Sequence, residues 1–307
     1  MRKITIVSRT SSLAMWQAKY IRLQLLKHHA QLSVDILGVK TLGDRWLEVP
    51  LHKVGGKGLF VKELEEALLA KEADIAVHSL KDVPAQFPEG LDIAAICERE
   101  NPFDAWVCPQ GFTLENIPKG SLIGTSSLRR QVQLKRLRPD LQYGSLRGNV
   151  DSRLRKCQEG HFDAIVLAVA GLARLNLLSH AKAIFSADQL LPAVAQGALG
   201  IECREEDSEI KALLAPLNHQ MTQICIKAER AMNKALGGNC QVPVAGFAQM
   251  KEGKLFLTGR VGHPESLLLL EATRSAPYEE AVSLGEQVAN DLIQQGAQKI
   301  ISDVLHG

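Results

Sequence analysis

A short segment, residues 78–84 with the sequence HSLKDVP, combines an acid and a cation where the chain is expected to leave a sheet. It follows the apolar run 75–77, a predicted buried strand, and the carboxyl edge of an α/β sheet is where ligands bind. Asp82 follows Lys81, and Pro84 restricts the backbone two residues later. A carboxylate on a stiff turn beside a cation can transfer protons or stabilise charge. The alternative is a surface turn with a local ion pair.

One cysteine stands apart from the others. Cys240 follows a Gly-Gly-Asn loop between a predicted helix and a predicted strand, where a thiol can serve as a nucleophile or an attachment point. No histidine base lies near it in the sequence, so spacing alone leaves a functional and a structural role equally open. The chain has no C-x-x-C pair and no zinc-like spacing, which predicts free thiols and no metal site. Five cysteines are predicted core residues: Cys97, Cys108, Cys157, Cys203 and Cys225.

Basic residues gather where predicted strands give way to helices. Arg9 and Ser11 lie at the first such turn, where backbone amides and the helix dipole favour an anion; the alternative is an ordinary cap with an exposed arginine. Cations at helix starts oppose the dipole unless an anion is bound there. The basic residues within 135–138 come late in their helix and are predicted to be solvated. Four arginines occupy predicted helix starts: Arg129, Arg130, Arg147 and Arg153.

The segment 53–58, KVGGKG, packs three glycines among two lysines. It is similar to a phosphate-binding loop, but no Ser or Thr follows the Gly-Lys pair and no strand leads directly into it, which argues against a Walker motif. The composition favours a mobile, cationic lid over an anionic ligand. A disordered linker is the alternative.

Alternating strand and helix patterns predict doubly wound parallel sheets, with arginine near the strand exits. Predicted strands cover residues 4–7, 34–39, 75–77, 121–124, 141–145 and 164–169, and predicted helices include 60–71 and the segment from 125 to about 138. The apolar segment 190–201 is predicted to cross back to the first domain, and the acidic cluster 202–209 to lie on the surface. A last domain is predicted to be antiparallel, with a helix at 222–236, strands at 242–250, 255–261 and 267–273, a hairpin turn at 250–254, and a closing helix from Glu279.

Length and composition fit a soluble globular protein of two or three domains. The chain has 307 residues, of which 46% are hydrophobic and 23% are charged. Its 36 Lys and Arg against 34 Asp and Glu give a net charge of +2, too small for nucleic-acid binding by a bulk field. No signal-peptide core follows Arg2 and Lys3, and the longest apolar run, 164–173, is too short to span a bilayer. We therefore expect a cytoplasmic protein without membrane partners.

Several long motifs, in order, show that the sequence resembles the porphobilinogen deaminase family essentially from end to end. They are KVGGKGLF at 53–60, DIAVHSLKDVP at 74–84, GTSSLRR at 124–130, SLRGNV at 145–150 and CQVP at 240–243. The resemblance implies two domains that resemble type II periplasmic binding proteins around a cleft, followed by a small α+β domain with a three-stranded antiparallel sheet. The implied boundaries are 1–98 with 198–216 for the first domain, 103–192 for the second and 220–307 for the third.

The resemblance also implies an activity. Four porphobilinogen molecules would be joined head to tail with loss of ammonia, giving the linear tetrapyrrole hydroxymethylbilane. Cys240 would hold a dipyrromethane cofactor, built from two substrate molecules, through a thioether. The family usually has glycine before this cysteine, whereas this chain has Asn239, a residue that tolerates left-handed backbone angles. The implied protein is a monomer that binds neither nucleic acid nor membranes.

Residue roles follow from the resemblance, position by position. Asp82, with Lys81, would stabilise positive pyrrole nitrogens and handle the proton transfers. The implied cofactor-binding residues are Cys240, Ser127, Arg129, Arg130, Lys81, Asp82 and Gly171. The implied substrate-binding residues are Arg9, Ser11, Thr125, Arg147, Arg153, Arg174 and Gln196. The implied mobile loop and its edge contain Lys53, Gly55, Lys57 and Phe60.

Two other classes of protein account for part of the pattern. A binding protein with the same cleft and no chemistry would explain the arginines, but it does not require Asp82 or Cys240. A nucleic-acid module would explain the basic cluster 129–155, yet only 5% of the residues are aromatic and the chain is nearly neutral. Turnover of substrate separates the first class from an enzyme, and a steep salt dependence of polynucleotide affinity would favour the second.

Overall fold

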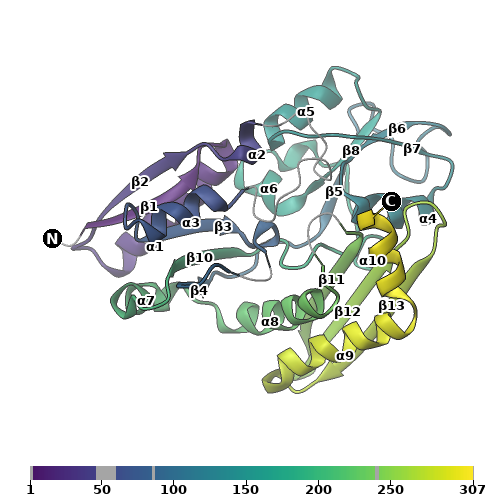
Figure 1. Cartoon of the computed structure of the whole chain (residues 1–307). Coiled ribbons are helices and arrows are strands. Elements are labelled where there is room, and N and C mark those ends of the chain that lie inside the picture. The colour runs from purple at the N-terminus through teal and green to yellow at the C-terminus, as the bar shows by residue number, and fades with distance from the viewer. Residues whose placement is uncertain (1–2, 46–59, 85–86, 239–241, 307) are drawn as a thin grey trace. The chain divides into compact units, whose positions relative to one another are not determined.

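The computed structural model describes residues 3–45, 60–84, 87–238 and 242–306 (Figure 1). The chain forms two compact units, one made of residues 1–100 with 198–223 and the other of residues 101–197 with 224–307. Each unit is therefore built from two separate stretches of sequence. Among the described residues, no helix combines the length and the apolar character needed to cross a bilayer.

The first unit contains a five-stranded mixed sheet in the order β2-β1-β3-β10-β4. β1, β2 and β3 are parallel, whereas β10 runs antiparallel to both of its neighbours, β3 and β4. The strands predicted at 4–7, 34–39 and 75–77 are confirmed, but β4 and β10 were not predicted, so the sheet is not wholly parallel. The strands are β1 (Lys3–Arg9), β2 (Ser33–Val39), β3 (Ile75–Ser79), β4 (Leu91–Ile96) and β10 (Leu199–Arg204).

Helices pack on both faces of this sheet because successive strand residues point to opposite sides. Ile6 of β1 belongs to the same core cluster as Ile21 of α1, whereas the next residue, Val7, belongs to the cluster that contains Leu64 of α3. The doubly wound arrangement is thus confirmed for this unit. Its helices are α1 (Ser12–His28), α2 (Leu42–Arg45), α3 (Lys62–Leu69) and α7 (Ser208–Leu214), with short 3-10 turns η1 (Leu80–Asp82) and η3 (Ala215–Leu217).

Two predictions are wrong for the segment 190–209, where the chain returns to the first unit. Residues 199–201 are not part of a crossover, because they begin β10. The acidic cluster does not all lie on the surface: Glu205, Glu206 and Glu209 are exposed, but Glu202 is fully buried in β10. The prediction of an exposed Glu202 failed because its partner is far away in the sequence. Without that partner, a glutamate in an acidic cluster has the pattern of a surface residue.

The second unit has its own five-stranded sheet, in the order β7-β6-β8-β5-β9. β7, β6 and β8 are parallel, as predicted, and β5 is antiparallel to β8. Val166 of β8 shares a core cluster with Leu134 of α4, whereas Ile165 shares one with Leu154 of α5, so helices again cover both faces. The elements are β5 (Asp104–Val107), β6 (Leu122–Gly124), α4 (Leu128–Leu137), β7 (Gln142–Gly144), α5 (Val150–Gln158), β8 (Ala164–Ala168), α6 (Val169–Arg174), η2 (Leu178–His180) and β9 (Ala183–Ile184).

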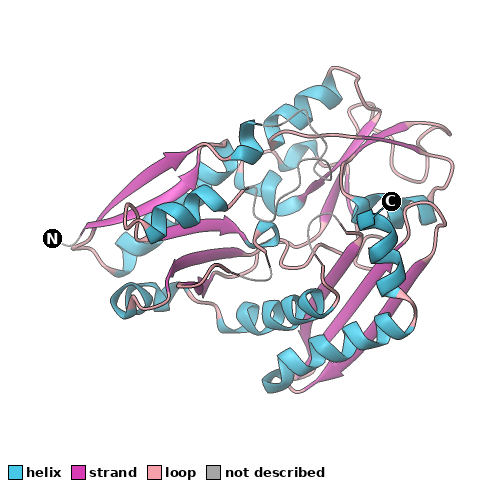
Figure 2. Cartoon of the chain, viewed as in Figure 1, coloured by secondary structure: helices cyan, strands magenta, loops and turns pink. Residues whose placement is uncertain are grey.

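The C-terminal part carries the predicted three-stranded antiparallel sheet, in the order β11-β12-β13 (Figure 2). Its first hairpin turns at Glu252 and Gly253, whose φ values of 50° and 76° match a turn that favours glycine. One helix, α10, was not predicted. The elements are α8 (Gln220–Ala235), β11 (Val244–Lys251), β12 (Lys254–Gly262), β13 (Leu269–Ala276), η4 (Tyr278–Glu280), α9 (Ala281–Gln294) and α10 (Ala297–His306).

Candidate active site

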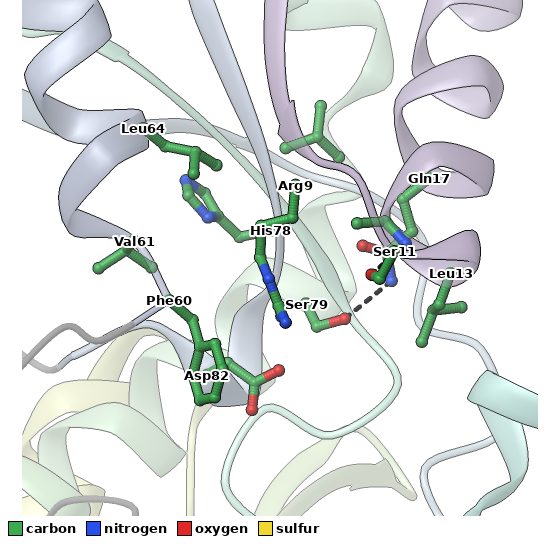
Figure 3. A pocket seen from close by; sticks show the side chains of 12 residues that line it. Arg9, Ser11, Leu13, Gln17, Phe60, Val61, Leu64, His78, Ser79 and Asp82 are labelled. Carbon is green, nitrogen blue, oxygen red and sulfur yellow. Dashed lines mark hydrogen bonds between the residues drawn. The ribbon is translucent and has the colours of Figure 1, made fainter. Parts of the chain in front are cut away.

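In the first unit, the ends of β1 and β3 bring the predicted residues around one pocket. Arg9 is the last residue of β1, and Ser11 caps α1 by accepting a hydrogen bond from the amide of Ala14 at 3.4 Å. Asp82 ends η1, the turn that follows β3. The pocket is lined by twelve residues (Figure 3): Arg9, Ser11, Leu13, Ala14, Gln17, Phe60, Val61, Leu64, Val77, His78, Ser79 and Asp82.

The Asp82 carboxylate is exposed to solvent on a turn whose backbone is anchored. The amide of Leu80 donates to the carbonyl of Ala198 at 3.0 Å, and the Leu80 side chain is 1% exposed. In Figure 3 the Asp82 carboxylate and the guanidinium end of Arg9 are directed toward the same part of the pocket. An accessible carboxylate on a fixed backbone, opposite a cation, suits proton transfer to a bound anionic substrate. Lys81, its neighbour, is half-buried.

An aromatic ring orients the cation of this pocket. The guanidinium carbon of Arg9 lies 4.4 Å from the centre of the Phe60 ring, within range of a cation–π contact. Phe60 itself sits against Gly43, where a Cβ atom would come within 2.3 Å of the ring. A side chain at residue 43 would therefore collide with the ring in this place, where Phe60 lines the pocket.

Gln17 is a pocket residue that the sequence did not reveal. Its side chain is 2% exposed, and its Nε2 donates a hydrogen bond to Ser79 Oγ at 2.8 Å. The bond joins α1 to the end of β3, three residues before Asp82. A polar residue within the apolar stripe of α1, between Ala14 and Ile21, was the available signal.

In the second unit, three parallel strands end at one edge and carry most of the remaining predicted residues. Thr125 and Ser127 follow β6, Arg147 follows β7, and Gly171 and Arg174 lie in α6 directly after β8. The first two exits are tied together, since the amide of Thr125 donates to the carbonyl of Gly144 at 3.0 Å. Ser127 is the N-cap residue of α4, yet its side chain makes no capping hydrogen bond.

The arginines at the start of α4 share one buried carboxylate. Asp104 Oδ2 lies 2.8 Å from Arg129 Nη2, and Asp104 Oδ1 lies 2.6 Å from Arg130 Nη2. Gln196, which is 1% exposed, donates to Oδ1 at 3.0 Å. Burial lowers the pKa of the Arg129 guanidinium, and the charge of Asp104 opposes that change. The sequence did not reveal Asp104, because it lies 26 residues from Arg130.

Two guanidinium groups against one carboxylate leave the buried cluster with a surplus of positive charge. Arg130 Nε has no hydrogen-bond partner among the described residues, and Arg174, 7% exposed, lies in the same unit with one guanidinium nitrogen 2.7 Å from the carbonyl of Gly197. Buried charge is costly unless it is compensated, so this edge favours an anion. Arg153 donates through Nε to the carbonyl of Gly148 at 2.7 Å, and Arg147 is half-buried.

Several predicted residues lie outside the described part of the chain, namely Lys53, Gly55, Lys57 and Cys240 together with Asn239. The other five cysteines are buried, so their prediction as core residues is confirmed. Burial raises the pKa of the Cys157 thiol to about 12 and that of Cys203 to about 11. Both are therefore neutral and poorly nucleophilic at pH 7.

We expect Asp104→Asn to destabilise the protein by about 3 to 5 kcal/mol, because it leaves two buried guanidinium groups without their shared counter-charge. Urea unfolding followed by circular dichroism measures the change. Asp188→Asn is the matched control, since its side chain is exposed and should change stability by about 0.5 kcal/mol or less. Equal stability of the two variants would contradict the role given to Asp104.

Comparisons with known proteins agree with the sequence motifs. A family model described as porphobilinogen deaminase, dipyromethane cofactor binding domain, matches residues 4–212, and one described as its C-terminal domain matches residues 223–294. Among solved structures, the VFT2 domain of BvgS from Bordetella pertussis is 16% identical, with 69% of this chain and 84% of that chain covered and a TM-score of 0.40. A probable amino-acid ABC transporter extracellular-binding protein, ytmK from Bacillus subtilis, is 10% identical, with 71% and 90% covered and a TM-score of 0.41.

Proposed function

The chain belongs to the porphobilinogen deaminase family, and we propose that Asp82 is the reacting carboxylate of its active site. The protein is a transferase of tetrapyrrole biosynthesis that polymerises porphobilinogen, with release of ammonia, to hydroxymethylbilane and uses a dipyrromethane cofactor. The observation that supports the role of Asp82 is its place in the pocket of the first unit, exposed on an anchored turn and opposite Arg9. A ligand-binding protein without chemistry, or a nucleic-acid module, would not account for the family match.

The reaction requires a carboxylate close to both the aminomethyl nitrogen of one pyrrole and the free α-carbon of another. In each cycle the C–N bond of an aminomethyl group breaks and ammonia departs, while a C–C bond forms at the free α-carbon of a pyrrole, which then loses its proton. A carboxyl group can donate a proton to the departing amine, stabilise as a carboxylate the positive charge that develops on the pyrrole nitrogen, and then accept the proton that the α-carbon loses after the C–C bond has formed. Asp82 is accessible to both partners, and Lys81 and Arg9 keep cationic charge close to it.

The remaining predicted residues bind the carboxylates of substrate and product. Porphobilinogen carries two carboxylates, and each condensation adds two more to the growing chain. Arginine matches a carboxylate through two parallel hydrogen bonds, and helix N-termini add backbone amides. In this proposal Arg9 and Ser11 act in the first unit, and five residues act in the second: Thr125, Arg147, Arg153, Arg174 and Gln196.

The donor set of the second unit fits the cofactor, which is a carboxylate-rich group. The surplus positive charge around Asp104 and the hydroxyl of Ser127, which is not used as a cap, supply what such a group needs. The dipyrromethane group supplies a primer whose free pyrrole α-carbon accepts the first substrate. We propose that it is attached at Cys240 and held by Ser127, Arg129, Arg130, Lys81, Asp82 and Gly171. The lysines of the segment 53–58 would close over the bound anions.

The role of Arg147 predicts that Arg147→Ala stalls chain growth. Loss of one carboxylate partner weakens binding of each longer intermediate, so we expect enzyme-bound intermediates to accumulate and product formation to fall by about 10-fold or more. Intact mass spectrometry after a substoichiometric addition of porphobilinogen gives the distribution of intermediates.

Arg136→Ala is the matched control, because Arg136 is an exposed arginine late in α4. It should leave the distribution unchanged. If Arg147→Ala gives the same distribution as Arg136→Ala, Arg147 does not support elongation.

The domain boundaries, the cellular location and the oligomeric state are also proposals. We propose three domains, 1–98 with 198–216, 103–192 and 220–307, and the family models support a boundary between residues 212 and 223. We also propose a cytoplasmic monomer. Light scattering on the purified protein should give a mass close to 33.6 kDa, and twice that mass would contradict the monomer.

A further inference from the structure

A buried pair of ionisable side chains, one of which lines the pocket, lies in the first unit. His78 Nε2 is 2.7 Å from Glu202 Oε2, and the two side chains are 4% and 1% exposed. Glu202 Oε1 has no hydrogen-bond partner among the described residues. In Figure 3 the His78 ring points away from the Asp82 carboxylate and toward Leu64, so it does not reach the place where substrate reacts. The pair must act through the backbone if it serves the reaction.

Strand register explains why these two side chains meet. β3 and β10 are antiparallel, with Gly200 opposite His78 and Glu202 opposite Ala76, so His78 and Glu202 are diagonal neighbours on one face. Gly200 leaves room on that face. A Cβ atom there would lie 2.6 Å from Leu80 Cδ1, which shows that the first residue of the Asp82 turn fills the space above this glycine. Gly200 therefore lies next to both the His78–Glu202 pair and Leu80, so the pair and the Asp82 turn meet at this glycine.

We propose that His78 and Glu202 are positioning residues for Asp82, and that their buried bond fixes the end of β3 from which the reacting carboxylate projects. Apolar packing resists separation but has no preferred direction, whereas a hydrogen bond fixes distance and angle together. A misplacement of about 1 Å in a catalytic group costs about 100-fold in rate, so a directional bond four residues before Asp82 matters for turnover. The inference rests on the proposed role of Asp82.

A third ionisable group extends the cluster to α3. Glu65 is half-buried, and its pKa is raised to about 7, first by burial and then by the charge of Glu202, while His78 opposes the rise. Other charged groups on the elements packed against α3 are Lys3 and Arg9 of β1 and Arg204 of β10, and the helix itself carries Lys62, Glu63 and Glu66. α3 also supplies Leu64 to the pocket wall. Ionisation of Glu65 thus places a second negative charge beside Glu202, within the cluster that holds the turn.

Two leucine variants distinguish a positioning role of His78 and Glu202 from a role in stability alone. Glu202→Leu leaves His78 unpaired in the interior, so we expect a lower Tm and a lower kcat. The double variant His78→Leu, Glu202→Leu removes both polar groups and should recover most of the Tm, because no buried group is left without a partner. Its kcat should stay about 10- to 100-fold below that of the unmodified protein, with KM for porphobilinogen changed by about threefold or less. Recovery of kcat together with Tm would overturn the inference.

Asp82→Asn, measured in parallel, keeps this outcome distinct from failure of the proposed function. If Asp82→Asn retains turnover, the role of Asp82 is wrong. If Asp82→Asn loses turnover while the double leucine variant keeps it, only the positioning role is wrong.

Glu65→Gln gives a second, milder test through pH. The pKa of Glu65 in the folded protein lies above its ordinary value of 4.5, so its contribution to stability is present below that value and is lost as pH rises through about 7. The ratio of kcat for Glu65→Gln to kcat for the unmodified protein should be near one at low pH and rise by about two- to threefold as pH passes 7. Glu72→Gln is the control, since Glu72 is an exposed glutamate just after the same helix, and should give a flat ratio. A flat ratio for Glu65→Gln would also count against the cluster.

Discussion

Replacement of Asp82 by asparagine is expected to remove nearly all turnover while the protein still folds. Asparagine has almost the same shape and still makes hydrogen bonds, but it can neither carry a proton nor balance a positive pyrrole nitrogen. General acid–base catalysis contributes about 10²- to 10⁴-fold, so the rate of hydroxymethylbilane formation should fall by about that factor. Because the carboxylate is exposed, the Tm should change little. Product formation and thermal unfolding, measured on the same sample, check both expectations.

The matched control is Asp92→Asn, an exposed aspartate on β4 of the same sheet, which should retain full activity. The variant Asp82→Asn should also keep the mass of the bound cofactor, which shows that assembly of the enzyme is intact. An Asp82→Asn protein that turns over porphobilinogen at the normal rate would remove Asp82 from the mechanism.

Replacement of Cys240 by serine is expected to abolish both cofactor attachment and turnover. The denatured protein should show an intact mass above the 33.6 kDa polypeptide by two linked pyrroles, and Cys240→Ser should lack that excess. A serine hydroxyl is a far weaker nucleophile than a thiolate at neutral pH, so the thioether should not form. Without a tethered primer, the substrate has no acceptor to which it can be joined.

Cys225→Ser is the matched control for the thiol. Cys225 is buried in α8, so its replacement should keep the extra mass and the activity, with only a modest loss of stability. An unmodified protein whose mass equals the bare polypeptide, and which stays bare after incubation with porphobilinogen, would contradict the role of Cys240.

Much of the fold could be predicted because strands and helices leave strong local patterns. The runs at 4–7 and 164–169 are short and mainly apolar, so β1 and β8 were predicted within a few residues. β10 was not predicted, because its neighbourhood is rich in Gly and Pro and its Glu202 looks like a surface residue. The partner that explains this glutamate, His78, is 124 residues away. A single sequence carries no local sign of such a pairing.

Some residues of the candidate site could also be predicted from the sequence, and others could not. Residues at strand exits, such as Asp82, Arg9 and Arg147, could be predicted as candidates because the topology of an α/β sheet gathers strand ends at one edge. Residues that support them from behind could not. Gln17 and Asp104 make contacts that form only when distant segments of the chain pack together. The residues next to them in the sequence give no indication of these contacts. Local pattern thus predicts residues at strand ends better than the residues that pack behind them.

The strand order of the first unit has a consequence during synthesis on the ribosome. β10 lies between β3 and β4, so the sheet stays split into two parts until residues up to Arg204 have emerged. During that interval β3 presents an unpaired apolar edge, with Ile75 and Val77 not yet covered by their partners, and such edges invite pairing with other nascent chains. The N-terminal half is therefore expected to depend on chaperones until the chain returns to it, and a protein truncated before β10 should aggregate.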